Sequence, residues 1–86
     1  MAPARHKIPR PTVKRLSLYL RELESLAEHD RPTISSRELG AALDLTDAQV
    51  RKDLGYFGQF GHPGIGYRVS ELIEHLRKIL GEGEDK

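Results

Sequence analysis

The feature that most constrains the fold is a pair of helix-start signals with room between them for only one short helix. Ser35 and Thr46 are each followed three residues later by a Glu or Gln, which is the capping-box spacing. The first signal predicts a short helix over 35–44, and the second predicts a helix over about 46–57. Two short helices joined by so tight a turn are typical of a helix-turn-helix. We expect Leu45, in the turn, to pack between them.

A longer helix is expected before this unit. Apolar residues recur at helical spacing over 11–29, and Pro11 suits the first turn of a helix because its missing N–H costs nothing there. Pro32 then interrupts the pattern. Thr33 and Ile34 are expected to form at most a short extended piece before the first of the two short helices.

A wing and a last helix are expected after the unit. The alternating apolar residues of 65–69 and the turn at 62–64 predict a β-hairpin, or wing, over about 59–69. Ser70 is predicted to cap a last helix, and Gly81 to end it. The predicted fold class is therefore mainly α with a small β-hairpin: a winged helix-turn-helix of about four helices and a wing.

Composition excludes several classes of protein. A chain of 86 residues fits one domain with one small core. It has no cysteine, and its apolar runs do not exceed three residues, which excludes disulfides and favours a cytoplasmic protein without membrane contact. His6, His29 and His75 lack metal-ligand spacing, and no catalytic combination of side chains gathers in the sequence. We expect neither a metal site nor catalysis.

The charges are distributed unevenly although the net charge is only +1. Six basic residues and no acidic one lie from Arg5 to Arg21, whereas 82–86 contains three acids and one base. We expect residues 1–10 to form a flexible basic arm, 11–81 a winged-helix domain, and 82–86 an acidic tail or the start of a linker. The basic end suggests an anionic partner, and a merely solvated arm is the plain alternative.

The outward face of the helix over 46–57 has the chemistry of a DNA reader. On a helical wheel, Lys52 lies opposite the apolar stripe. Gln49 lies next to Lys52, and Arg51 lies to one side of this outward face. In the major groove, Gln can pair with adenine, and Lys or Arg with guanine. Gly55 keeps this face low at a cost in helix stability, which a close approach to DNA would explain. We predict Gln49, Arg51 and Lys52 as base readers; an amphipathic helix with a solvated face is the alternative.

Further polar residues are predicted to contact the DNA backbone or a groove. They are Arg10, Arg15, Thr46, Tyr56, His62, Tyr67 and Arg68. An exposed turn residue explains His62 equally well. Asp53 and Glu38 lie near basic residues and are expected to form surface ion pairs or to orient their neighbours.

Two other classes of function are alternatives to DNA binding. A winged-helix protein-interaction module without DNA binding would carry an acidic or apolar outward face on 46–57, and this face is neither. A small enzyme would need side chains for catalysis, which the sequence does not display.

Several segments together resemble one known family. The run Gln49–Gly58 and the Gly-Ile-Gly-Tyr of 64–67 resemble the N-terminal winged-helix DNA-binding domain of Rex, the bacterial redox-sensing transcriptional repressor. The opening around Ile8 and the Ser35–Gly40 segment also resemble it. The similarity spans about 7–81, and it implies a repressor domain that recognises DNA.

The resemblance also implies partners and a cofactor. Rex proteins are homodimers that bind inverted-repeat operators in double-stranded DNA, and their C-terminal Rossmann domain binds NADH or NAD+. These 86 residues contain no Gly-x-Gly-x-x-Gly unit, so we expect no cofactor in this chain. In Rex-like proteins the sensor domain supplies most of the dimer interface, so the resemblance implies that these residues alone form a monomer or a weak dimer. Pro63 stands where the family often has a basic wing residue, so His62 or Arg68 would have to supply that contact.

Overall fold

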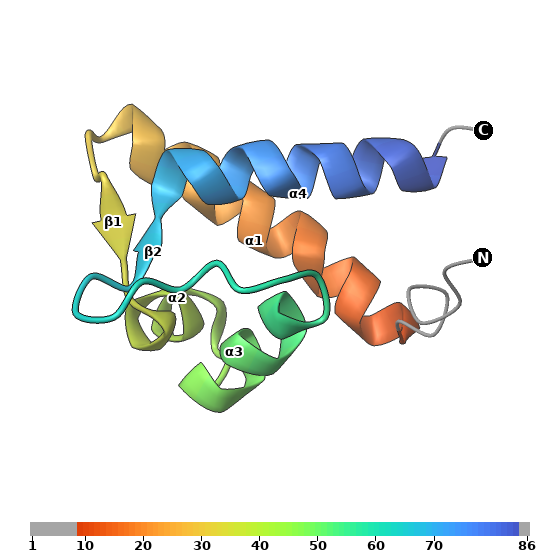
Figure 1. The fold of residues 1–86 in the computed structure, drawn as a ribbon, viewed down its shortest axis with the longest axis horizontal. Helices are drawn as coiled ribbons and strands as arrows, with labels where there is room; N and C mark the ends of the chain where they lie inside the picture. The colour runs from red at the N-terminus through yellow and green to blue at the C-terminus, as the bar shows by residue number, and fades with distance from the viewer. Residues whose placement is uncertain (1–8, 85–86) are drawn as a thin grey trace.

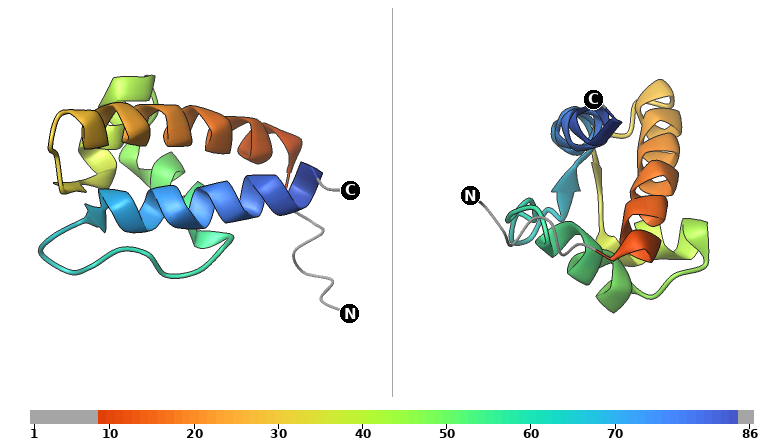
Figure 2. Two further views of the ribbon diagram at one scale, coloured as in Figure 1. Left: turned by 90° about the horizontal axis from the view of Figure 1, so that it is seen from above. Right: turned by 90° about the vertical axis from the view of Figure 1, so that its right-hand side faces the viewer.

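The long helices form one layer and the short helices the other (Figure 1). The computed structural model describes residues 9–84. The elements are α1 (Arg10–Glu28), β1 (Thr33–Ile34), α2 (Ser36–Leu43), α3 (Asp47–Gly55), β2 (Tyr67–Arg68) and α4 (Val69–Glu84). Helices α1 and α4 run antiparallel side by side, and α2 packs mainly on α3 (Figure 2). This agrees with the predicted mainly-α class. Residues 1–8 of the predicted arm lie outside the described residues.

The helix-turn-helix forms where the capping signals predict it. The Ser35 hydroxyl accepts from the Glu38 N–H at 3.0 Å, and the Glu38 carboxylate accepts from the Ser35 N–H at 3.0 Å. Helix α2 ends at Leu43, and its C-cap residue Asp44 has the left-handed conformation. The turn then folds closely onto α2: the Leu45 N–H donates to the Gly40 carbonyl at 2.8 Å, and a Cβ on Gly40 would lie 2.6 Å from the Leu45 carbonyl oxygen. Leu45 packs against the core, as expected.

The core lies between the two layers. Its buried apolar residues come from every helix and both strands: Leu16, Tyr19, Leu23, Ile34, Leu39, Val50, Leu54, Tyr67, Val69, Leu72, Ile73 and Leu76. Partly buried apolar side chains, such as Phe57 and Phe60, cover its edges. Burial of these side chains holds α3 against α1, which fixes the direction in which the outer face of α3 points.

The wing differs from the predicted hairpin. Strand β2 pairs with β1, with Ile34 opposite Tyr67, and not with a neighbouring strand of the wing. Between α3 and β2 the chain forms a loop closed by one isolated bridge, His62 with Gly66. The predicted strand over 65–69 is too long, because Val69 already begins α4 and donates its N–H to the Pro32 carbonyl at 2.9 Å.

Two predicted ends of α4 are wrong. Ser70 does not cap the helix, because α4 begins at Val69. Gly81 does not stop it, because α4 continues to Glu84. Glycine costs about 1 kcal/mol within a helix but does not forbid one. Within residues 9–84, no helix is both long and apolar enough to cross a membrane.

Candidate nucleic-acid interface

Helix α3 presents one face to solvent and buries the other. Val50 and Leu54 are buried against the core, whereas Lys52, Gly55 and Tyr56 are exposed. No acceptor for the Lys52 ammonium lies within hydrogen-bond distance in the part of the chain that the structure describes. The outward placement of Lys52 and Tyr56 on the helical wheel is thus confirmed.

Arg51 is exposed but already engaged. Its Nη1 donates to Asp47 Oδ2 at 3.0 Å, one turn earlier on α3, and to Ser36 Oγ at 3.2 Å, at the start of α2. Its side chain also borders a hollow of about 380 Å³ between α3 and the wing loop, where Gly55, Phe60 and Tyr67 contribute to the lining. The guanidinium therefore lies where both short helices begin and where the wing comes near.

Gln49 does not project outward as the wheel suggests. Its side-chain Nε2 donates to Asp53 Oδ1 at 2.9 Å, and the residue is half-buried. The second capping box is consequently half formed: the Thr46 hydroxyl accepts from the Gln49 N–H at 3.1 Å, but no return bond from the Gln49 side chain is present in the described residues. Thr46 itself is exposed and acts as the N-cap of α3.

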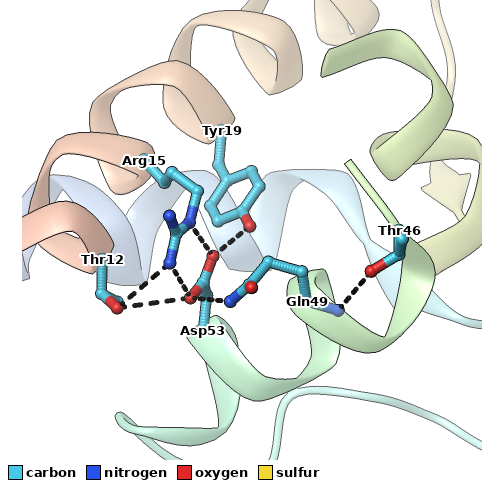
Figure 3. A network of polar contacts seen from close by, with 6 residues as sticks. All are labelled: Thr12, Arg15, Tyr19, Thr46, Gln49 and Asp53. Carbon is cyan, nitrogen blue, oxygen red and sulfur yellow. Dashed lines mark hydrogen bonds and ion pairs between the residues drawn. The ribbon is translucent and has the colours of Figure 1, made fainter. Parts of the chain in front are cut away.

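Asp53 is the centre of a polar network that joins α1 to α3 (Figure 3). Its carboxylate is completely buried, which contradicts the expected surface ion pair. Arg15 donates to it twice, from Nε to Oδ2 at 2.6 Å and from Nη2 to Oδ1 at 3.0 Å. The hydroxyls of Tyr19 and Thr12 also donate to it, the latter at 3.4 Å. Arg15, predicted to contact DNA, thus holds the two helices together.

The network shifts the pKa values of its members in opposite directions. Burial alone would raise the pKa of Asp53, but donation from Arg15, Tyr19 and Gln49 outweighs it and holds that pKa below its usual value. Burial, with the hydrogen bond to Asp53, raises the pKa of the Tyr19 phenol far above its usual value. Asp53 is therefore charged and Tyr19 neutral at physiological pH.

The wing is tied to α4 by two contacts. The Nε2 of His62 lies 2.9 Å from Oε1 of Glu71, and this hydrogen bond holds the pKa of Glu71 below its usual value. The rings of Phe60 and His75 lie 4.8 Å apart at 35°. His62 is thus neither a free turn residue nor a side chain pointing away from the protein.

The other predicted site residues lie on different surfaces. Arg10 is exposed at the start of α1, and Arg68 is exposed on β2. Tyr67 is buried, 7% exposed, and burial raises the pKa of its phenol. The structure therefore gathers Arg51, Lys52 and Tyr56 around α3, and places Arg15, Gln49 and Tyr67 largely within the fold.

The amino-acid sequence shows membership of a family. Residues 7–55 match the family described as "Putative DNA-binding protein N-terminus". The chain belongs to this family. The matched segment ends at the last residue of α3, so it includes the complete helix-turn-helix.

Curated relatives match a longer part of the chain than the family does, over 75 residues in the first of them. The chain is similar to the redox-sensing transcriptional repressor Rex of Carboxydothermus hydrogenoformans, with 52% identity over 75 residues, which is 87% of this chain and 36% of the relative. The Rex proteins of Syntrophobacter fumaroxidans and Chloroflexus aurantiacus are 51% and 49% identical, over 87% and 85% of this chain and 36% and 34% of their own lengths. The chain thus spans about a third of these relatives.

Solved structures of RSP, described as a Rex-family repressor, have the same fold over the matched part. RSP in complex with beta-NAD+ and operator DNA matches with a TM-score of 0.83 and 46% identity, over 86% of this chain and 34% of that one. RSP in complex with beta-NADH matches with a TM-score of 0.77 and 41% identity, over 87% of this chain and 33% of that one. These matches confirm the resemblance to the N-terminal Rex domain and the winged-helix fold class.

Proposed function

We propose that this chain is the sequence-specific DNA-binding domain of a transcriptional repressor of the Rex kind, with α3 as its recognition helix in the major groove. The observation that supports this proposal is the outward face of α3, where Lys52 is exposed and has no polar partner among residues 9–84, beside Arg51 and Tyr56. A Rex-family protein has the same fold in its complex with operator DNA. A helix enters the major groove and reads it with such donors. The domain would occupy residues 11–81, after the basic arm of 1–10 and before the acidic tail or linker start of 82–86, and the helices α1 and α4 extend it to Arg10 and Glu84.

The roles of the side chains follow from their positions. Lys52, Arg51 and Gln49 would read bases, with Gln49 first leaving Asp53, which keeps its other donors. Thr46 and Tyr56 lie at the two ends of α3 and would contact phosphate, as would the exposed Arg10 and Arg68. His62 would approach the backbone from the wing. Arg15 and Tyr67 are held within the fold, so any contribution from them would use the accessible edge of the side chain.

The proposal has consequences for the longer protein. Repression at an inverted-repeat operator calls for two copies, supplied by a homodimer, and an NADH/NAD+ response would reside in a further domain. Its site of action would be the cytoplasm, and no enzymatic step is assigned to the 86 residues. A protein-interaction module is the weaker alternative, because the outward face of α3 is basic and not acidic or apolar.

A selection followed by a titration tests the proposal. The domain would be incubated with a duplex library randomised over 24 base pairs, and the bound duplexes would be sequenced. We expect an enriched inverted repeat. Fluorescence anisotropy should then show tighter binding to the enriched duplex than to its scrambled version, with affinity for both falling as salt rises. Equal binding to the two duplexes at every salt concentration would contradict sequence-specific recognition.

A further inference from the structure

The anchoring of Arg51 leaves one edge of its guanidinium free. Both hydrogen bonds of this side chain use the same nitrogen, Nη1, which donates to Asp47 Oδ2 at 3.0 Å and to Ser36 Oγ at 3.2 Å. Among residues 9–84, no acceptor lies within hydrogen-bond distance of Nη2 or Nε. These two nitrogens form the edge with which arginine binds two acceptors side by side, as on guanine O6 and N7.

The two anchors belong to different helices. Asp47 is the first residue of α3 and Ser36 the first residue of α2, so the guanidinium is fixed relative to the whole helix-turn-helix. Arg51 lowers the pKa of Asp47 by hydrogen bonding and by its charge, so the Asp47 carboxylate is ionised at neutral pH. A side chain held in place before binding loses less conformational entropy when it binds.

Stability does not account for this arrangement. Arg51 and Asp47 are both about half exposed, with side-chain exposures of 56% and 48%, and ion pairs this exposed contribute little to folding. An acidic side chain on a surface that approaches phosphates also opposes nonspecific attraction to DNA. Both effects favour sequence-specific binding of DNA over nonspecific binding.

We propose that Asp47 and Ser36 are positioning residues for recognition, which hold Arg51 by Nη1 so that its Nη2 and Nε edge reads one guanine of each half-site. This inference rests on the proposed function and adds to it the two residues that set specificity without touching a base.

The test is the 24-base-pair library selection, repeated with single variants. Arg51→Ala should abolish the preference for guanine at one position of each half-site. Asp47→Asn should lower the preference at that same position roughly 3- to 10-fold, and Ser36→Ala should lower it less. The other positions of the motif should be unchanged. Asp30→Asn is the matched control, because it removes the same charge at the far end of α1 and should leave the motif intact.

Each alternative result has a distinct meaning. An unchanged preference in Asp47→Asn, at the position lost in Arg51→Ala, overturns the positioning role while sequence-specific binding stands. An equal weakening at all positions in Asp47→Asn also overturns it, because it points to a general effect on charge or folding. A parent domain that enriches no motif contradicts the proposed function itself. In an Arg51→Ala background, Asp47→Asn should change no position of the motif, and a loss of preference at any other position there would count against the proposal.

Discussion

Asp53 couples α3 to α1 through one buried carboxylate. It accepts from Thr12, Arg15 and Tyr19 on α1 and from Gln49 on its own helix. A carboxylate offers about four acceptor positions, so these donors fill it. A buried charge is stable when hydrogen-bond donors satisfy it. Removal of the carboxylate or of its donors leaves a buried polar group without a partner, which costs free energy.

Asp53→Ala should therefore lower the free energy of unfolding by about 3–5 kcal/mol, because Arg15 and Tyr19 lose their shared partner. Urea denaturation at pH 7 measures this. The control is Asp30→Asn, an exposed acid at a φ of 58°, which asparagine also adopts. The control should change stability by less than about 0.5 kcal/mol. A loss below about 1 kcal/mol in Asp53→Ala would show that the network adds little.

The same network predicts stability limits at both ends of the pH scale. The folded-state pKa of Asp53 lies below its unfolded value of about 3.9, so its contribution is present above pH 4 and is lost as the pH falls through the folded pKa. The folded-state pKa of Tyr19 lies above its unfolded value of about 10, so its contribution is present below pH 10 and is lost at higher pH. Denaturation series across pH should show that Tyr19→Phe reduces the alkaline loss and leaves the acid loss in place. The same alkaline slope in both proteins would contradict this assignment.

Lys52 is exposed on α3, whereas Asp53 is buried, so Lys52 is expected to affect DNA binding and not folding. Lys52→Ala should weaken binding to the selected duplex by about 1–3 kcal/mol and binding to scrambled DNA much less, because base contacts carry sequence information. Anisotropy titrations on both duplexes measure the two losses. Lys78→Ala, an exposed lysine on α4, is the matched control for charge. An equal loss on both duplexes in Lys52→Ala would show that Lys52 contacts only phosphate.

At the scale of elements, local signals were predictable and distant pairing was not. The capping box at Ser35 and the break at Pro32 act within a few residues, and the structure follows both. The partner of β2 is β1, more than thirty residues earlier, and this pairing rather than the sequence of the wing ends the strand at Arg68. The sequence signal at Gly81 predicted a helix end, but the helical residues on both sides of it continue α4 to Glu84.

The candidate site shows the same division. Exposure of Lys52 and Tyr56 followed from the helical wheel, which depends on α3 alone. The inward position of Gln49 depends on Asp53, and burial of Asp53 depends on α1. A signal for this was present: Asp53 lies three residues after Val50 on the apolar stripe, and Thr12, Arg15 and Tyr19 share one face of α1. Polar residues in register on two apolar faces indicate a buried network.

Alanine substitutions at two helical glycines are expected to change stability in opposite directions. Gly40→Ala should destabilise the fold by at least about 1 kcal/mol, because its Cβ would lie 2.6 Å from the Leu45 carbonyl oxygen and the turn would have to move. Gly55→Ala should stabilise it by about 0.5–1 kcal/mol, since nothing lies within 4 Å and alanine favours a helix. Thermal and urea unfolding measure both.

Gly55→Ala should also weaken binding to the selected duplex if the outer face of α3 approaches base edges as closely as the proposed function requires. Gly81→Ala is its control, because Gly81 is likewise helical with nothing within 4 Å but lies on α4. Unchanged DNA affinity in both variants would show that Gly55 is not at the closest approach.

Across the molecule, the exposed large apolar residues come from several elements, in the part of the chain whose burial the structure describes. Val13 and Leu18 on α1, Tyr56 after α3 and Ile65 in the wing are each 41–45% exposed. The apolar face of α4 is largely covered, since Leu72, Ile73 and Leu76 are buried and Ile79 and Leu80 are half-buried. Stable dimers bury larger continuous surfaces, so this domain offers little for a tight dimer of its own.

DNA should therefore supply the spacing that the isolated domain lacks. Sedimentation without DNA should give a monomer or weak dimer at micromolar concentration. On an inverted repeat with half-sites about one helical turn apart, two domains should bind more tightly than one binds a half-site, because the duplex holds them side by side and raises the effective concentration for their weak mutual contact. Inserting about five base pairs between the half-sites turns the second domain to the opposite side of the duplex, so the gain should vanish while half-site affinity persists. Stoichiometry from sedimentation of the complexes and anisotropy on the three duplexes measure this, and a tight dimer without DNA would instead place a protein interface on α1 or α4.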